Sequence, residues 1–542
     1  MDVLLVSGLG PSLKNSDYLD GTMLDRRDGR ANTDRYLAGT ALDGFHLGML
    51  GFRHQGHEYP LLRPRYDNVP HLTTFAVQEI IERAGHVVEV YDTTHLWSDE
   101  GAADPPDGDF RAVLLSTSFI WTERDLRRAV DWVGDHFPGV PLVLGGQFSN
   151  LKFSHLMRQL PSVDFIVRGD GEEAIPALLR TIETGADPAG VPNLVYRHPR
   201  ELLGYRLGPF SYLDLDAYPS PAPRGTWSVV PYESMRGCPF DCKFCSFPAA
   251  SPKWRYKSAR KIADDWTRYA EVNGASYISA MDSTFTVPPT RLRELTSLLP
   301  AVGIGWEGYS RANVLKSAEL VDAIAATHCQ FLSIGFESMS DNTLKHMSKR
   351  VTRKDNLRAF RLLTEGGLGY RCSFMAGYPG ETPEDFRETQ DFLAEEYAGH
   401  FMLSVFSISD ETMPLWEDKE ALQIEVHDPD DPDYSWSHIG MDVRTARHLN
   451  HSTLDLVRRR NERAVLRLWQ ADYQHLLMPH LGRWENIAIE KAVERIGMTP
   501  RDFDDPAEAV PYVRTQLEVL ERYGVHVHPD VRQLSAEPLF HR

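Results

Sequence analysis

Short apolar runs alternate with amphipathic stretches in two long series, and this alternation constrains the fold of the 542-residue chain more than any other feature. A short apolar run bounded by turn residues is typical of a buried strand. Strands that alternate with helices are typical of a parallel sheet covered by those helices. The chain is too long for one core, so about two to four domains are expected. We therefore predict an α/β protein in which each series builds its own sheet.

The first series predicts a doubly wound, Rossmann-like domain with helices on both faces of its sheet. We expect strands at residues 3–6, 87–92, 112–118, 141–146 and 164–167, and helices at 71–84, 122–137 and 172–184. A long polar stretch at 11–70 interrupts the series, and an insertion of that length is usually functional or partly disordered.

Three segments at expected strand ends carry residue types that suit ligand binding, and ligands of such sheets bind at the carboxyl ends of the strands. Glycines let a backbone approach a ligand, while hydroxyl and amide groups offer hydrogen bonds. No segment is specific alone, so a generic nucleotide-binding or regulatory domain is an open alternative. The segments are Ser116-Thr117-Ser118, Gly145-Gly146-Gln147 and Arg168-Gly169-Asp170-Gly171-Glu172.

The second series follows a stretch at residues 185–230 whose many glycines and prolines predict a linker between domains. We expect strands at 228–234, 277–281, 303–309, 331–336, 370–376 and 402–407, and helices at 258–272, 289–299, 317–327, 341–347, 354–365 and 383–397. Chemistry in barrels of strands and helices sits where the strands end.

Three of the five cysteines, Cys238, Cys242 and Cys245, fall within eight residues directly after the first strand of the second series. Three thiolates can hold three irons of a [4Fe–4S] cluster and leave the fourth iron open to a small molecule. A structural zinc site normally needs four protein ligands in paired spacing, and no second C-x-x-C exists. A disulfide framework fits a long chain with few cysteines poorly. Cys329 and Cys372 lie in or beside apolar strands and are expected to be core residues.

The segment from Met235 to Cys245 resembles the cluster-binding loop of the radical S-adenosylmethionine (SAM) enzymes. The resemblance implies a [4Fe–4S] cluster held by the three cysteines, SAM bound to its open iron, and Phe244 near the adenine. The six expected strands of the second series are consistent with the partial (β/α)6 barrel of that family.

Four later segments are similar to SAM-binding segments of the same family, and one of them is residues 306–311 (WEGYSR), which end at Arg311. Residues 333–338 (SIGFES) match its strand of the "iGiES" type, residues 377–382 (GYPGET) its "GlPGET" turn, and residues 280–285 (AMDSTF) occupy the place of its Gly-Gly-Glu region, without the glycines. For each polar residue the alternative is a surface or capping role. The resemblance implies ribose and amino-acid contacts from Glu337 and Ser338, adenine contacts from Gly377, Pro379 and Gly380, an amino-group contact from Asp282 or Ser283, and a carboxylate contact from Arg311.

The order and spacing of the three strand-end segments of the first series resemble the cobalamin-binding domain that precedes many radical SAM barrels. The resemblance implies that these segments surround the nucleotide tail of the corrinoid. Many cobalamin proteins place a cobalt-ligating histidine in D-x-H-x-x-G, and the spacing around His46 differs from that pattern. We therefore expect a base-off corrinoid without a histidine on cobalt, and ordinary polar or capping roles for His46 and His71. Arg63 and Arg65 are expected to be solvent-exposed, with a place near the corrin face as the alternative.

These interpretations give a layout of four parts. We expect a cobalamin-binding domain at 1–190, a linker at 191–227, a radical SAM partial barrel at 228–415 and a mainly helical cap at 416–542. Helical patterns at 444–468 and 484–496 support the cap, which we expect to set substrate choice. Trp436 and His438 could face the open end of the barrel, with a packing role for Trp436 as the alternative.

The charge balance excludes one class of partner. The chain has 58 Lys and Arg against 77 Asp and Glu, a net charge of −19, which argues against nucleic-acid binding through a basic face. No apolar run reaches the length of a membrane span, and the N-terminus is typical of a first strand rather than a signal peptide. We expect a cytoplasmic protein without a membrane or nucleic-acid partner.

The resemblance implies a cobalamin-dependent radical SAM C-methyltransferase of natural-product or peptide tailoring. A 5′-deoxyadenosyl radical would remove a hydrogen atom from a carbon, and methylcobalamin would supply the methyl group. The alternatives are a non-methylating rearrangement, cyclisation or oxidation with the same cofactors, and a corrinoid-binding sensor or carrier. We expect a small-molecule or peptide substrate and an external low-potential electron donor such as a flavodoxin or ferredoxin.

Overall fold

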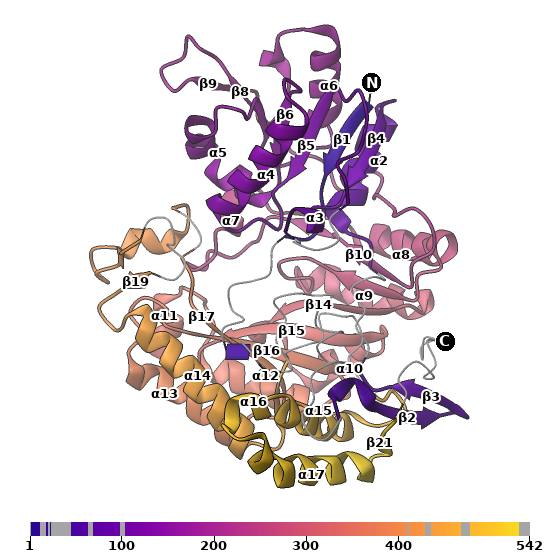
Figure 1. The fold of residues 1–542 in the computed structure, drawn as a ribbon, viewed down its shortest axis with the longest axis vertical. Coiled ribbons are helices and arrows are strands. Elements are labelled where there is room, and N and C mark those ends of the chain that lie inside the picture. Colours follow the sequence, from indigo (N-terminus) through magenta and orange to yellow (C-terminus); the bar gives the residue numbers. More distant parts are fainter. Residues whose placement is uncertain are drawn as a thin grey trace.

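The chain forms two large sheets that lie one above the other in Figure 1, joined by the segment that leads to the cysteines. The structure is a computed structural model that describes residues 2–10, 18–19, 22, 45–62, 69–97, 103–408, 411–428, 435–467 and 477–529. Arg63 and Arg65, and most of the polar stretch at 11–44, lie outside the described residues. None of the helices in the described ranges is long and apolar enough to cross a membrane.

The first sheet has seven strands in the order β4-β1-β5-β6-β7-β8-β9, of which the first five are parallel. Its parallel part has the flavodoxin-like order, with a switch point between β1 and β5 where a ligand is expected. The strands are β1 (Asp2–Val6), β4 (Val87–Tyr91), β5 (Ala112–Ser116), β6 (Leu142–Gly145), β7 (Phe165–Val167), β8 (Leu194–Arg197) and β9 (Tyr205–Leu207).

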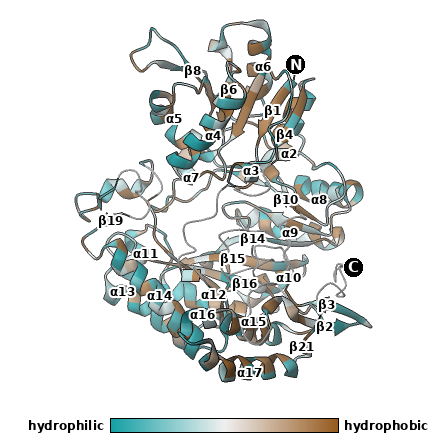
Figure 2. Ribbon diagram, viewed as in Figure 1, coloured by the Kyte–Doolittle hydropathy of each residue, from teal (hydrophilic) through white to brown (hydrophobic). Residues whose placement is uncertain are grey.

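Helices cover both faces of this sheet because its strands are apolar on both sides. Val3 and Leu5 of β1 pack into one core, while Leu4 and Val6 pack into another. Figure 2 shows these strands in brown and much of α4 in teal, as expected for helices that turn a polar face to solvent. The helices are α2 (Leu72–Arg83), α3 (Thr94–Trp97), α4 (Glu123–His136), α5 (Gln147–Gln159) and α6 (Ala174–Thr184).

The second sheet also has seven strands, all parallel, in the order β10-β13-β14-β15-β16-β17-β20. The six strands expected from the sequence are present in order. They are β10 (Val229–Tyr232), β13 (Tyr277–Ala280), β14 (Gly305–Arg311), β15 (Cys329–Glu337), β16 (Gly369–Ala376) and β17 (Gly399–Val405), followed by β20 (Ala464–Leu466).

The crossover helices begin at clear capping signals. Thr352 with Asp355, and Thr382 with Asp385, form capping boxes before α12 and α13. The helices of this half are α7 (Phe247–Ala250), α8 (Ala259–Asn273), α9 (Pro289–Val302), α10 (Ala318–Ala325), α11 (Asp341–His346), α12 (Arg353–Glu365), α13 (Pro383–Asp391), α14 (Val443–Arg460), α15 (Arg483–Gly497), α16 (Thr499–Asp502) and α17 (Pro506–Arg522). A two-stranded ribbon, β11 (Met235–Arg236) with β12 (Arg255–Tyr256), flanks the cysteine loop.

The structure differs from the expected layout in four places, three of them local. The stretch taken for a linker contains β8 and β9, which extend the edge of the first sheet as antiparallel strands. The helix expected at 444–468 ends at Arg460, because Asn461 turns its amide to the carbonyls of Leu393 and Tyr397, and β20 follows. Helix α5, between β6 and β7, was not expected.

A fourth and larger difference joins the two ends of the chain. From the polar insertion, β2 (Leu50–His54) and β3 (His57–Pro60) form a three-stranded sheet with β21 (Val525–Val527) near the C-terminus. In Figure 1 this sheet lies beside α15 and α17, far from the first sheet. Part of the residues assigned to the first domain therefore packs with the C-terminal helices, a long-range contact that local pattern does not encode.

Candidate active site between the two sheets

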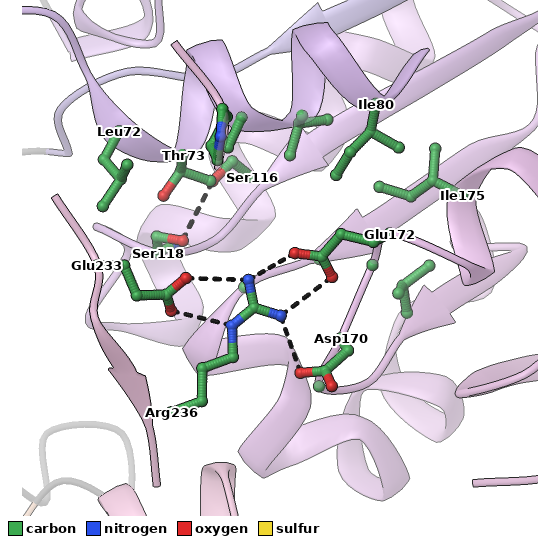
Figure 3. Close-up of a pocket in the computed structure, with 18 of the residues that line it drawn as sticks. Leu72, Thr73, Ile80, Ser116, Ser118, Asp170, Glu172, Ile175, Glu233 and Arg236 are labelled. Carbon is green, nitrogen blue, oxygen red and sulfur yellow. Dashed lines mark hydrogen bonds and ion pairs between the residues drawn. The ribbon is translucent and has the colours of Figure 1, made fainter. Parts of the chain in front are cut away.

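A cavity of ≈ 350 Å³ lies where the carboxyl ends of β1, β5, β6 and β7 meet the segment that leads to the cysteines. One wall is apolar and reaches into the core between the sheet and helices α2 and α6. Leu5, Leu114 and Val143 of the sheet and Ile80 and Ile175 of the helices line it. Figure 3 shows Ile80 and Ile175 on this side. The position matches the switch point of the sheet.

The mouth of the cavity is polar and shaped by glycines. Gly146 has φ of +107°, and a Cβ there would come 2.7 Å from the backbone nitrogen of Ser118, so the turn requires glycine. A Cβ on Gly145 would meet nothing within 4 Å. The backbone at Gly145 is therefore open to a ligand in the cavity.

Nine of the eleven residues predicted to surround a nucleotide tail line this cavity. Thr117 and Arg168 do not: Thr117 is buried and bonds to Gly145 and Ser149, and the Arg168 guanidinium stacks 3.9 Å from the Phe153 ring. The nine are Ser116, Ser118, Gly145, Gly146, Gln147, Gly169, Asp170, Gly171 and Glu172.

Arg236, two residues before the first cysteine of the loop, crosses the cavity mouth and holds three carboxylates (Figure 3). Its guanidinium lies 3.0 Å from Asp170 Oδ1, 2.5 Å from Glu172 Oε1 and 3.0 Å from Glu233 Oε2. Asp170 and Glu172 belong to the first sheet, whereas Arg236 and Glu233 belong to the second half. We call these four residues the Arg236 clamp.

Arg255 reinforces the Arg236 clamp from β12. Its Nη1 donates to Asp170 Oδ2 at 2.6 Å and to the carbonyl of Leu213 at 2.9 Å. Burial alone would raise the pKa of Asp170, but the hydrogen bond from Arg255 and the charge of Arg236 hold it below the usual value. Asp170 thus stays ionised and ties the strand end of β7 to the cysteine-bearing half.

A buried lysine forms another part of the cavity wall. Lys257 donates from Nζ to Ser220 Oγ at 2.7 Å and lies 3.8 Å from Asp265 Oδ2 and 4.2 Å from the Tyr232 ring. Burial lowers the pKa of Lys257 to about 8, against a smaller opposing effect of Asp265. This wall can therefore lose a positive charge near neutral pH.

The cysteine loop turns at Gly237, whose φ is +78°. A Cβ there would meet the carbonyl oxygens of Ser251 and Lys253 at 2.8 Å, so the loop packs directly on a segment that lines the cavity. Cys242 is buried, while Cys238 and Cys245 are half-buried. Burial, with smaller contributions from the other two thiols, raises the pKa of Cys245 to about 11. The three thiols are therefore close enough to influence one another.

The thiols are not arranged around a single ion. Within the described ranges, no three His, Cys, Asp or Glu side chains gather closely enough to hold one metal ion. In a [4Fe–4S] cluster each of three thiolates binds a different iron, so the thiolates stand further apart than the ligands of one ion. The donor set of three cysteines from one loop fits such a cluster.

Two cations stand beside the thiols. Arg311, at the end of β14, lies 3.4 Å from Cys242 Sγ and 3.9 Å from the Phe240 ring, and donates to the carbonyl of Lys349. Lys349 Nζ pairs with Glu337 Oε1 at 2.6 Å and lies 5.3 Å from the Phe244 ring. Arg311, Glu337 and Phe244, three predicted SAM contacts, thus gather around Cys242 and Lys349.

Two other predicted SAM contacts are engaged within the protein. Asp282 is buried and accepts hydrogen bonds from the backbone nitrogens of Ser234 and Met235 and from Ser234 Oγ. Ser338 is also buried, with its hydroxyl directed to Ser340 and Thr389. Ser283, in contrast, is exposed, and its Oγ lies 3.5 Å from the carbonyl of Gly237. Ser283 is therefore the one of the 282–283 pair that a ligand can reach.

The turn of Gly377, Pro379 and Gly380 is buried under the C-terminal region. His438 Nδ1 accepts from the backbone of Gly380 at 3.3 Å, and its Nε2 donates to the carbonyl of Gly377 at 3.3 Å. Burial lowers the pKa of His438 to about 4, so the ring is neutral at pH 7. Trp436 stacks on His438 with ring centroids 5.4 Å apart, and it is fully buried. Both residues brace the turn.

Sequence reasoning missed Arg236, Glu233, Arg255, Lys257 and Lys349. Arg236 and Glu233 lie two and five residues before Cys238, and charged residues so close to the cysteines could have been recognised as candidates from the sequence. Lys349 follows Glu337 by twelve positions, in a Ser-Lys-Arg turn after α11. Its pairing with Glu337 depends on how that turn folds back, which the sequence does not reveal.

The chain is similar to known radical SAM proteins. Residues 232–393 match the radical SAM superfamily. An uncharacterized methyltransferase of Pyrococcus horikoshii is 26% identical over 306 residues, covering 53% of this chain and 64% of the relative. An anaerobic magnesium-protoporphyrin IX monomethyl ester cyclase of Synechocystis is 23% identical over 267 residues, covering 46% and 53%. The chain spans between about half and two thirds of the length of these relatives.

A solved structure extends the likeness to nearly the whole chain. The radical SAM methyltransferase TsrM of Kitasatospora setae, with tryptophan and a SAM analogue bound, superposes with a TM-score of 0.58 at 17% identity, covering 96% of this chain and 99% of that one. At that identity the likeness shows a shared fold. TsrM has also been solved with cobalamin and a [4Fe–4S] cluster bound. The predicted resemblance to cobalamin-dependent radical SAM enzymes is confirmed.

Proposed function

We propose that this chain, which carries a radical SAM domain at residues 232–393, is a cobalamin-dependent C-methyltransferase acting on a natural-product or peptide substrate. One observation carries the proposal. The cavity at the switch point of the first sheet opens against the segment that bears the cysteines, and the Arg236 clamp spans its mouth. Two cofactors bound there would face each other.

The residues present fit both cofactors. Cys238, Cys242 and Cys245 would bind the cluster, and the apolar wall and glycine mouth of the cavity would take the nucleotide tail of a corrinoid. Bound together, the cluster with SAM supplies a 5′-deoxyadenosyl radical and the corrinoid supplies a methyl group. We also propose that the corrinoid would be bound base-off, without a histidine on cobalt, because the spacing around His46 differs from the D-x-H-x-x-G pattern.

The protein's own residues would bind and orient SAM. Arg311 and Lys349 place two positive charges beside Cys242, where a carboxylate would be held. Glu337 already holds Lys349 in place, and Ser283 offers an exposed hydroxyl next to the loop. Half-buried Phe244 would offer an apolar surface for a base, and buried Tyr378 braces it edge to face with ring centroids 6.5 Å apart.

The proposal is tested by product analysis under anaerobic conditions. The reconstituted protein is incubated with SAM, methylcobalamin, a low-potential reductant and candidate substrates. We expect 5′-deoxyadenosine and S-adenosylhomocysteine together, with the reductant replaceable by a flavodoxin or ferredoxin. Absence of S-adenosylhomocysteine with every substrate tested would count against methyl transfer.

A non-methylating reaction with the same cofactors is a second candidate. The similarity to the magnesium-protoporphyrin IX monomethyl ester cyclase supports it, since that relative is named for a ring closure. Here 5′-deoxyadenosine is expected without S-adenosylhomocysteine, so one assay separates the two candidates.

A further inference from the structure

The second sheet has one covered face and one open face. Along β16, Tyr370, Cys372 and Phe374 are buried in the main core, whereas the intervening Arg371 and Ser373 are half-buried. In β17 the same alternation leaves Met402 exposed between buried Phe401 and Leu403, an arrangement typical of a sheet with helices on one side. The open side is therefore the inner face of the partial barrel.

One row of side chains crosses this inner face. The strand register places Tyr309 of β14 beside Ser333 of β15, and Ser333 beside Arg371 of β16. Met281, at the end of β13, and Met402 of β17 lie on the same face. Met281, Tyr309 and Met402 are 45%, 41% and 40% exposed, although the protein buries most side chains of this kind. The row of Met281, Tyr309, Ser333, Arg371 and Met402 is thus largely apolar, and Arg371 is its one cation.

That cation has almost no internal partner. The Arg371 guanidinium donates from Nη2 to Ser333 Oγ at 2.8 Å, and it makes no ion pair within the described part of the chain. The other arginines near the site are engaged: Arg236 and Arg255 hold carboxylates and Arg311 lies on Cys242. A guanidinium has five N–H donors in a planar fork that matches a carboxylate, so Arg371 offers an anchoring site.

The Arg371 row lies close to the proposed chemistry. Tyr309 precedes Arg311 by two residues on the same face of β14, a step of about 7 Å along a strand. Arg311 in turn contacts Cys242. A molecule held at Arg371 and lying along Tyr309 and Met281 would reach toward the cysteine loop, because Asp282 and Ser283 follow Met281 and contact that loop.

We propose that the inner face binds a substrate with a carboxylate and an aromatic or aliphatic body, and that Arg371 binds the carboxylate while Tyr309 and Met402 contact the body. This assignment rests on the proposed function only for what happens after binding. The carboxylate of SAM is a different anion, for which Arg311 and Lys349 beside Cys242 are the nearer cations.

Binding tests the proposal without turnover. The full chain, reconstituted and saturated with SAM, is titrated with 3-phenylpropionic acid, indole-3-propionic acid and decanoic acid and with their primary amides, by ligand-observed NMR. At least one acid is expected to bind about tenfold or more tightly than its amide, as loss of a charge-assisted hydrogen bond implies. Arg371→Gln should remove that preference, Arg371→Lys should keep part of it, and Arg387→Gln, an exposed arginine of α13, should leave it unchanged.

Three results would overturn the assignment: none of the acids binds, each acid and its amide bind equally, or Arg371→Gln binds the acids as the unaltered protein does. A fourth result that would overturn the assignment is a change in SAM affinity, and it is measured separately. SAM affinity should be unchanged in Arg371→Gln, and a matching loss would show that Arg371 serves the cofactor. Failure of methyl transfer, read from S-adenosylhomocysteine, is independent of all four results.

Discussion

Both sheets have seven strands, and the strands next to their sites are parallel, but the two sheets differ in how their faces are covered. Strand β1 sends Val3 and Leu5 into one core and Leu4 and Val6 into the other, so both faces of the first sheet are covered. Strand β16 alternates buried Tyr370 and Cys372 with half-buried Arg371 and Ser373. A parallel strand that is apolar throughout indicates a doubly covered sheet, whereas an alternating one indicates an open face.

The two halves can therefore serve different tasks. The cavity of the first sheet opens at the strand ends and reaches between the sheet and helices α2 and α6, where Leu114 and Val143 line it. The second sheet offers strand ends and an inner face, so it can hold a cofactor and a substrate together. The Arg236 clamp is one of the contacts that join the two halves, as is the hydrogen bond from Asn150 to the carbonyl of Ala250. The following variants separate the contributions of the halves.

The largest effect is expected from Cys242→Ala. Loss of one of three cluster ligands should abolish 5′-deoxyadenosine formation, while the first sheet should still bind cobalamin. Iron content and product analysis report the first effect, and equilibrium dialysis with hydroxocobalamin reports the second. Cys372→Ala, a core cysteine away from the loop, is the matched control and should keep its iron. If the Cys242→Ala protein still forms 5′-deoxyadenosine, the proposed cluster with Cys242 as a ligand is not needed for SAM cleavage.

Arg236→Gln should weaken the connection between the halves. It leaves Asp170, Glu172 and Glu233 without their shared cation, and breaking a buried pair costs about 3–5 kcal/mol. Because the Arg236 side chain is 21% exposed, we expect a loss of about 2–4 kcal/mol in the free energy of unfolding, measured by urea titration. Arg236→Lys should lose less. Arg206→Gln, which removes the surface pair with Glu201, is the control and should change little. If Arg236→Gln and Arg206→Gln lower the free energy of unfolding equally, the Arg236 clamp does not stabilise the fold.

Glu381→Gln should remove a pH dependence from the turn after β16. Burial raises the pKa of Glu381 to about 8 against a usual 4.5, and its Oε2 accepts from the Gly377 backbone at 2.7 Å. The folded chain therefore binds this proton more tightly than the unfolded chain does. Stability from the group is full below pH 4.5 and declines as the pH rises toward 8, by up to about 1.4 kcal/mol per pH unit.

Glutamine imitates the protonated carboxyl, so Glu381→Gln should unfold like the unaltered protein at pH 5 and be more stable at pH 8. Thermal unfolding at the two pH values measures the difference. A constant difference between the two proteins at both pH values would show that Glu381 does not titrate in this range.

Gly145→Leu should fill the cavity without disturbing the fold. Nothing lies within 4 Å of a Cβ there, so the side chain would occupy space proposed for the corrinoid. We expect cobalamin affinity to fall about tenfold, a loss of about 1.4 kcal/mol, with SAM binding at the second sheet unchanged. Gly134→Leu on α4, also with nothing within 4 Å, is the control. Unchanged cobalamin affinity in Gly145→Leu would place the corrinoid elsewhere.

Local pattern predicted much of this fold because buried parallel strands are short apolar runs with turn residues at their ends. All six expected strands of the second half were found at their places, and Thr382-Pro383 marked the start of α13. The prediction was wrong at β8 and β9, because the many glycines and prolines of this stretch indicated a linker although it also holds short apolar runs. It also failed at β20, because Ala464–Leu466 fit the helical pattern expected at 444–468, whereas the helix ends at Arg460 and Asn461 turns the chain toward β20.

Residues of the candidate site that are neighbours in the sequence could be predicted. Residues that come together only when distant segments pack could not. The cysteine spacing and the three strand-end segments are local, and most of those segments line one cavity. The ion pair of Lys349 with Glu337 and the hold of Arg236 on Asp170 join distant residues, so only the folded chain reveals them. The same packing shows Asp282 and Ser338 to be internal, although their motifs match.

The central claim is that a corrinoid in the first half and SAM at the second half meet across the Arg236 clamp, and it can be tested without knowing the substrate. The reconstituted protein, holding reduced cobalamin, is mixed with SAM that carries a deuterated methyl group. We expect transfer of the labelled methyl group to the corrinoid, with an equal amount of S-adenosylhomocysteine, both measured by mass spectrometry. Protein that binds cobalamin and SAM yet transfers no label would contradict it.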